Sequence, residues 1–431
     1  MTFAESIRFL FSLGHELKVV KWDLERMRIL LAALGDPHRQ GRFVHVAGTN
    51  GKGSTCAMIG AALRASGLRT GLYTSPHLVS PRERIVVGGE MISEAAWVAA
   101  FQEVHGAAER LLASDVIADH PSFFETVTAM AFLAFANAKV EITVLETGLG
   151  GRLDATNVVV QPEVAVITPI DFDHEAFLGS GIESIAAEKA GILKTGRPAV
   201  FAAQRPEALR VLENRALDLD IAVRHSSSWR VEELVVDRYG SRFTLAGDEE
   251  IPIECPLAGM HQVENARTAV TALALIGVPA AAIRAGIAAV KWPGRLEWVS
   301  TDPEIILDGA HNPAGARALG DYIREFFANE PIRIVFGAMR DKAVEEVTNT
   351  LFPLAAEIIL TAPDQPRALH PQALLEATGE DRARSCVAES VREALAMVSE
   401  MDKQKPMTTF VTGSLFLVGE ARALCVNRDG G

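Results

Sequence analysis

Short runs of apolar residues alternate with alanine-rich stretches along the first half of the chain. The apolar runs cover residues 43–46, 70–73, 142–145, 164–168 and 198–202. Such runs, when they alternate with helices, are typical of a parallel sheet that is covered on both faces. Residues 5–35 are predicted to form helices, because apolar side chains recur there at helical spacing. The pattern therefore predicts an α/β fold.

Two segments interrupt this alternation. Residues 84–87 and 90–92, joined by Gly88 and Gly89, predict a β-hairpin. From about residue 222 to 254 the apolar period shortens, and residues 229–237 and 241–245 predict antiparallel strands. A turn-rich break at 292–295 precedes a second αβ series, with apolar runs at 304–307, 333–336, 357–361, 385–388 and 408–411. We expect one domain over residues 1–292 and a smaller one over residues 293–431.

The composition narrows the functional classes. Acidic residues outnumber basic ones by 55 to 42, for a formal net charge of −13. General nucleic-acid binders and proteins of anionic membranes need a positive field, so we expect neither partner. The four cysteines form no CxxC pair, the N-terminus lacks a signal-peptide layout, and the apolar stretch 129–138 is too short to span a bilayer. These features predict a cytoplasmic, reduced protein.

Polar or glycine-rich clusters follow four of the predicted strands. They occupy residues 48–55, 74–77, 146–154 and 171–174. Ligands of open α/β sheets bind beyond the carboxyl ends of the strands. If the strands are parallel, all four clusters converge on one edge, which is the main reason to expect a binding site there.

The first cluster, GTNGKGST, reads as a phosphate-binding loop between a strand and a helix. Its glycines allow backbone N–H groups to wrap an anion, Lys52 would contact the β- and γ-phosphates, and Ser54 could bind Mg²⁺. The spacing departs from the general P-loop, since two residues rather than four separate Gly48 from the Gly51-Lys52 pair. A plain glycine turn is the alternative interpretation. The flanking strand and helix favour nucleotide binding.

Three further residues are candidates for the same edge. Glu146 ends an apolar run, where a carboxylate could bind Mg²⁺ or simply face solvent. His174 follows two aspartates in a loop, and the converging edge favours a ligand over a structural histidine. Lys189 lies in a predicted helix, and from the residues alone it is expected to be a surface lysine paired with a nearby acid.

Several motifs in one order resemble the folylpolyglutamate synthase/dihydrofolate synthase family of the Mur ligase superfamily. They are GTNGKGS (48–54), TSPHL (74–78), ETGLGGRLDATN (146–157), DH (173–174), EKAGI (188–192), PGR (293–295) and DGAHNP (308–313). The resemblance runs over residues 5–420. It implies a parallel-sheet P-loop ATPase domain with a small antiparallel β insertion, followed by a smaller Rossmann-like α/β C-terminal domain.

The resemblance also implies ATP-dependent amide-bond formation. The γ-phosphate of ATP would pass to the carboxylate of dihydropteroate or a reduced folate, and the amino group of L-glutamate would attack the acyl phosphate. The implied cofactors are ATP and Mg²⁺ at two sites, with K⁺ as a further candidate cation, and the implied oligomeric state is a monomer. Two alternatives are another Mur-type amino-acid ligase acting on a nucleotide-sugar peptide and an ATP-binding switch without ligase chemistry.

Carried over by position, the motifs assign a role to each candidate residue. Lys52, His174 and Lys189 are the expected catalytic residues, and Lys189 matches the family's carbamylated lysine. The expected metal ligands are Ser54, Ser75, Glu146 and His174. The nucleotide is expected to contact Asn50, Gly51, Lys52, Gly53, Ser54, Thr55, Asn265, Arg295, Asp308 and His311.

The pterin is expected to contact the N-terminal helix pair, the SFFE run and the RLD run. The residues are Arg26, Ser122, Phe123, Phe124, Glu125, Arg152, Leu153 and Asp154. Trp22 and Asp23 stand where the family usually has a small glycine, and Ser122 replaces its usual threonine. Because all the implied ligands are anions, a locally positive cleft is also expected, formed by Lys52, Arg82, Arg84, Arg152, Arg295, Arg340 and Lys342.

Overall fold

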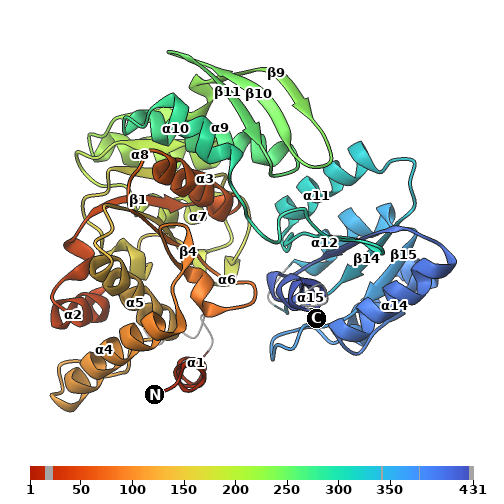
Figure 1. The fold of residues 1–431 in the computed structure, drawn as a ribbon, viewed down its shortest axis with the longest axis horizontal. Coiled ribbons are helices and arrows are strands. Elements are labelled where there is room, and N and C mark those ends of the chain that lie inside the picture. The colour runs from red at the N-terminus through yellow and green to blue at the C-terminus, as the bar shows by residue number, and fades with distance from the viewer. Residues whose placement is uncertain (15–22, 341–342, 378, 427–431) are drawn as a thin grey trace.

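The computed structural model describes residues 1–14, 23–340, 343–377 and 379–426. Its elements form two lobes, each built around its own sheet (Figure 1). Trp22 and Lys342 lie outside the described residues. None of the described helices is both long and apolar enough to cross a membrane.

The first lobe is built on an eight-stranded sheet with the order β4-β3-β2-β5-β1-β6-β7-β8. Its parallel strands are β1 (Arg42–Ala47), β2 (Thr70–Tyr73), β5 (Ile142–Glu146), β6 (Val164–Ile167), β7 (Ala199–Phe201) and β8 (Val223–His225). The predicted hairpin, β3 (Ile85–Val87) and β4 (Glu90–Met91), continues the sheet antiparallel at one edge.

Helices cover both faces of this sheet, as the continuous apolar strands predict. On β1, Val44 and Val46 face one side, where they pack with α3 (Lys52–Ala65), α9 (Met260–Leu275) and α10 (Ala280–Ala288). Phe43 faces the other side, because successive side chains of a strand alternate. The helices on that side are α1 (Phe3–Ser12), α2 (Glu25–Ala33), α4 (Glu94–Ala113), α5 (Phe123–Asn137), α6 (Glu175–Leu178), α7 (Ile182–Ala190) and α8 (Pro206–Asp218).

An antiparallel sheet extends the first lobe, as predicted. It consists of β9 (Arg230–Val236), β10 (Ser241–Ala246) and a third strand in addition to the two predicted ones, β11 (Glu250–Cys255). Its alternating apolar residues, such as Phe243 and Ile251, join the core beneath α9 and α10. Ahead of this sheet, the short strand β8 pairs in parallel with β7, which the sequence analysis did not predict.

The second lobe contains a six-stranded sheet with the order β12-β13-β17-β14-β15-β16. The strands are β12 (Glu297–Thr301), β13 (Glu304–Leu307), β14 (Ile332–Phe336), β15 (Glu357–Leu360), β16 (Ser385–Val387) and β17 (Thr408–Thr412), and only β12 is antiparallel. One face packs against α11 (Pro313–Phe326), α12 (Val344–Leu351) and α13 (Pro371–Ala377), and the other against α14 (Val391–Gln404) and α15 (Leu415–Val426). The α/β fold with a small antiparallel insertion and a second α/β unit is therefore confirmed.

Candidate active site

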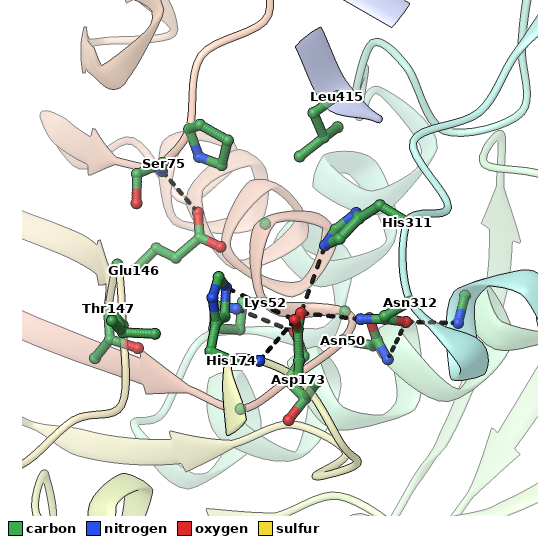
Figure 2. Close-up of a pocket in the computed structure, with 18 of the residues that line it drawn as sticks. Asn50, Lys52, Ser75, Glu146, Thr147, Asp173, His174, His311, Asn312 and Leu415 are labelled. Carbon is green, nitrogen blue, oxygen red and sulfur yellow. Dashed lines mark hydrogen bonds and ion pairs between the residues drawn. The ribbon is translucent and has the colours of Figure 1, made fainter. Parts of the chain in front are cut away.

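A cavity of about 580 Å³ lies between the two lobes, at the carboxyl ends of the parallel strands of the first sheet. All four polar clusters contribute to its lining, as the parallel order of β2, β5, β1 and β6 requires. The second lobe adds Arg295, residues 308–312 and residues 414–416. Figure 2 shows side chains from both lobes pointing into this space.

The phosphate loop joins β1 to α3, and at two positions of the loop only glycine fits. Gly51 caps α3 with φ 82°, and a Cβ there would lie 2.2 Å from Asn265 Oδ1. A Cβ on Gly48 would lie 1.9 Å from Thr168 Oγ1. The Lys52 ammonium donates to the Thr49 carbonyl at 3.1 Å, which holds it at the start of the helix. Backbone N–H groups, the helix N-terminus and Lys52 together form an anion site.

The candidate nucleotide residues from later in the chain meet this loop. Asn265 donates to Gln262 at 3.0 Å and packs on Gly51, while Arg295 and Asp308 line the cavity from the second lobe. The buried Asp308 carboxylate accepts the Leu296 N–H at 3.1 Å and the Ala310 N–H at 2.9 Å. Thr55 is buried within α3 and does not line the cavity.

Glu146 and Ser75 form an oxygen-rich corner beside the phosphate loop (Figure 2). The Glu146 carboxylate accepts the Ser75 N–H at 3.1 Å. Burial raises the pKa of the Glu146 carboxyl, and the Lys52 charge opposes this shift. The Ser75 hydroxyl is buried and has no hydrogen-bond partner among the described residues. Unsatisfied oxygens next to a carboxylate fit Mg²⁺, a hard cation, and Ser54 lines the same part of the cavity.

Lys189 is not the surface residue that its local sequence suggests. It is only 4% exposed, and its ammonium donates to the Gly48 carbonyl at 2.7 Å. Burial, with a smaller contribution from the Lys52 charge, lowers the pKa of Lys189 to about 7. The helix that carries Lys189, α7, packs closely on Gly151, where a Cβ would lie 2.8 Å from the Glu188 carbonyl oxygen of that helix. Glycine at position 151 therefore allows α7 to lie this close. With a pKa of about 7, a substantial fraction of the amine is uncharged near neutral pH.

Asp173 links the two lobes, which the sequence interpretation missed. Its carboxylate accepts from the Asn312 amide at 3.1 Å and lies 3.5 Å from His311 Nε2. Asn312 also donates to Asn50 at 3.0 Å and caps α11 by accepting the Gly315 N–H. His174 directly follows Asp173 in the chain. Figure 2 shows these two residues close to Lys52, with His311 and Asn312 approaching from the second lobe. The DGAHNP motif predicted that this segment belongs to the site, but it did not predict that Asn312 connects the two lobes.

Asp171 makes a second link between the lobes. Its carboxylate accepts from Arg205 at 2.7 Å and from Arg317 of α11 at 2.6 Å. Neither arginine was singled out from the sequence, because each lies far along the chain from its partner.

The expected pterin residues lie around the far end of the cavity, with two exceptions. Arg26 forms a bidentate pair with Glu125, the shortest contact being 2.7 Å, and Glu125 also completes the capping box of α5 with Ser122. Phe124, Leu153 and Asp154 line the cavity. Phe123 is buried and does not line it, and Arg152, which also lies outside the lining, pairs at 2.8 Å with Glu188.

Asp154 organises the turn that follows β5. Its carboxylate accepts the Gly148 N–H at 2.8 Å and the Leu149 N–H at 2.9 Å, and burial raises its pKa. These bonds hold the GLGG segment against the cavity, so Asp154 shapes this part of its lining.

The expectation of a positive cleft is wrong. Arg82 and Arg84 pack over Phe3 and Phe123, Arg340 donates to the Ala368 carbonyl, and none of the three lines the cavity. The lining cations are Arg26, Lys52, Lys189, Arg205, Arg295 and Arg367, and they are outnumbered by Asp23, Glu125, Glu146, Asp154, Asp171, Asp173, Glu264 and Asp308. A phosphate group in so acid-rich a cavity would be repelled unless cations offset the carboxylates.

Comparison with known families matches most of the chain to two models. Residues 46–273 match the Mur ligase middle domain, and residues 294–415 match the glutamate ligase domain of Mur ligases. A Bacillus subtilis protein named dihydrofolate synthase/folylpolyglutamate synthase is 37% identical over 421 residues, which cover 94% of this chain and 95% of the relative.

Solved structures agree with this match. The structure of Mycobacterium tuberculosis folylpolyglutamate synthase complexed with ADP superimposes with a TM-score of 0.91 at 36% identity, covering 98% of each chain. Escherichia coli FolC in complex with DHPP and ADP has a TM-score of 0.86 at 31% identity, with 100% of this chain and 99% of that chain covered. These matches disfavour both a ligase for nucleotide-sugar peptides and a switch without ligase chemistry.

Proposed function

The chain belongs to the folylpolyglutamate synthase/dihydrofolate synthase family of Mur ligases, and on this premise we propose that its cavity activates the carboxylate of dihydropteroate or a reduced folate as an acyl phosphate. The protein is an ATP-dependent ligase that adds glutamate. The observation that carries the proposal is the continuous cavity, which places the phosphate loop, the Glu146 and Ser75 corner, Lys189 and the Phe124 end within one space.

The chain's own residues would divide the reaction between them. The phosphate loop and Lys52 orient the triphosphate, so that the γ-phosphate faces the acceptor carboxylate. Transfer of the phosphoryl group breaks the bond to ADP and forms the acyl phosphate, and the glutamate amine then displaces phosphate to give the amide. Positioning and charge neutralisation dominate such a reaction, since the protein does little covalent chemistry.

The metal ligands are proposed on the same geometry. Glu146, Ser75 and Ser54 are suited to hold one Mg²⁺, and His174 a second, with the Asp173 carboxylate nearby. Magnesium, when bound, would neutralise the charge that builds up on the transferred phosphoryl group.

Lys189 is proposed to act as a carbamate. Its buried, weakly basic amine would add carbon dioxide to give a carbamate and a released proton, which converts a cation into an anion. Such an anion next to Asp173 and His174 would complete an oxygen-rich set for the second Mg²⁺. Before carbon dioxide adds, the amine donates a hydrogen bond to the Gly48 carbonyl.

Phosphate release from ATP tests the proposed function. We expect release that requires both L-glutamate and an acceptor, with dihydropteroate and tetrahydrofolate both active. The oligomeric state stays a prediction, and sedimentation under assay conditions would check that the chain is a monomer. Release that is independent of the acceptor would contradict the proposal, because the acyl phosphate cannot form without it.

A further inference from the structure

Two histidines and a glutamate form a cluster outside the active-site cavity. His105 and Glu109 lie one turn apart on α4, and His120 lies in the segment between α4 and α5. One candidate ligand atom from each residue lies within 4.8 Å of the other two. None of the three lines the active-site cavity, so the proposed reaction does not use them. Helix α1 packs beside them against α4 (Figure 1).

The two imidazole rings turn unsatisfied nitrogens toward one carboxylate. His105 Nδ1 and His120 Nε2 each lie 3.8 Å from Glu109 Oε1. Both nitrogens are buried, and neither has a hydrogen-bond partner within the described part of the chain. Leaving a buried polar atom unpaired costs free energy, so buried ring nitrogens usually bind a polar group, a water molecule or an ion.

The other nitrogen of His120 fixes its protonation pattern. His120 Nδ1 lies 2.8 Å from the Pro121 carbonyl oxygen. Because a carbonyl only accepts, Nδ1 carries the hydrogen, and in the neutral ring Nε2 retains its lone pair. Histidines that bind metals commonly donate their second ring N–H in this way, which orients the ring toward the ion.

Aromatic packing holds both rings in place. The Phe9 ring of α1 lies 4.5 Å from His105 and 5.4 Å from His120, measured between ring centroids. Phe101, one turn before His105 on α4, stacks on the same imidazole at 5.4 Å. The rings are therefore fixed by the fold, while the Glu109 side chain is 55% exposed and free to adjust.

We propose that His105, Glu109 and His120 bind a divalent metal ion of the zinc class, at a site separate from the Mg²⁺ sites of the reaction. Imidazole nitrogens select zinc and neighbouring transition metals, whereas Mg²⁺ prefers oxygen ligands. Ligand atoms around a tetrahedral zinc lie about 3.3 Å apart, so the two 3.8 Å separations from Glu109 require a contraction of about half an ångström. The third pair of ligand atoms lies within 4.8 Å, so it has to close by at most about 1.5 Å. Solvent at the exposed carboxylate supplies the fourth ligand and the route of entry.

The site would act on structure rather than on chemistry. An ion there would join the C-terminal half of α4 to the segment that leads into α5. Ser122, which caps α5, follows His120 by two residues, and Phe124 of the same helix lines the acceptor end of the cavity. Metal binding would therefore stiffen the support of that end.

Zinc titration of the full-length protein tests the site. The protein is treated with EDTA, dialysed, and titrated calorimetrically with ZnCl₂ in the presence of excess Mg²⁺ and ADP, which occupy the reaction's metal sites. We expect about one equivalent of bound zinc. The substitutions Glu109→Gln and His120→Gln should each weaken binding by at least about tenfold, because each removes one of three ligands.

A matched control separates this site from any exposed histidine. His225 Nε2 lies 3.9 Å from the Glu213 carboxylate, but the described residues offer this pair no third ligand. His225→Gln should therefore bind zinc like the parent protein. Co²⁺ gives a second readout, since four-coordinate Co²⁺ has strong visible bands that should disappear in the Glu109→Gln/His120→Gln variant.

Two results would overturn the proposal. The first is an absence of zinc binding by the parent protein, and the second is equal zinc affinity in the parent and the double variant. Folding does not obscure the test, because Glu109 is a largely exposed side chain whose substitution leaves the core intact.

Discussion

Replacing Lys189 by alanine tests the carbamate most directly. Folding lowers the pKa of this lysine from 10.5 to about 7. At pH 7.5 this change raises the uncharged fraction from about 0.1% to about three quarters, a gain of nearly three orders of magnitude in the form that adds carbon dioxide. Burial lowers the pKa of the lysine because it destabilises the charged ammonium and leaves the neutral amine almost unaffected. Below pH 7 the amine becomes protonated and carbamate formation should fail.

The expected loss of activity in Lys189→Ala is large. Removing one electrostatic contact to a developing charge typically lowers kcat by about 10²–10³-fold, and a metal ligand should fall in this range. The assay is acceptor-dependent phosphate release. Acetate or formate should restore part of the rate by occupying the space of the lost carbamate, and depletion of bicarbonate should slow the parent enzyme but not the rescued variant.

Lys194 provides a matched control for this experiment. It is also partly buried, with a pKa lowered to about 8, mainly by burial, but its ammonium donates to Asn157 at 2.7 Å and does not line the cavity. Lys194→Ala should show no rescue by carboxylates. Full activity of Lys189→Ala, or equal rescue of both variants, would refute the carbamate.

Three further substitutions test other parts of the site. His174→Ala should lower the rate of acyl-phosphate formation by at least about tenfold, measured by single-turnover kinetics, while the affinity for ADP changes little. A defect confined to ADP affinity would count against the second metal site. Gly51→Ala should abolish ATP binding in calorimetry with native circular dichroism retained, because its Cβ would collide with Asn265. Asn312→Asp should keep the α11 cap but place a second carboxylate against Asp173, so that the radius of gyration with ATP analogue increases; an unchanged scattering profile would contradict this.

Much of the fold follows from the sequence, since strands and helices arise from local apolar patterns. The runs at β1, β5 and β6 are buried on both faces and could be recognised as parallel strands. Strand β8 could not, because Val223–His225 is only three residues long, with an exposed arginine at its centre. Strand β12 was missed for a similar reason, since its side chains are only partly buried at the edge of the sheet.

The residues of the site could be predicted where the backbone topology determines their position. They could not be predicted where a long side chain contacts a partner that is distant in the sequence. Glycines of the phosphate loop and polar residues at strand ends are fixed by topology, so their convergence could be foreseen. Arg317 of α11 instead donates to Asp171 at a separation of 146 residues, and Lys189 donates to Gly48 at a separation of 141 residues. Local sequence does not show which of several partners such a side chain meets, because that choice depends on packing between separate elements.

The acid-rich lining of the cavity links the fold to a requirement for cations. Two unit charges 4 Å apart interact by about 4 kcal/mol at an effective dielectric constant of 20. A carboxylate at that distance from a phosphate would therefore cost several times the ~0.3–1 kcal/mol that a helix N-terminus supplies, and Glu146 and Asp173 both line the cavity. Lys52 and Arg295 would offset part of this repulsion. We expect bound Mg²⁺ to offset the rest, so removal of divalent cations should weaken ADP binding in calorimetry, and equal affinity with and without Mg²⁺ would contradict this reasoning.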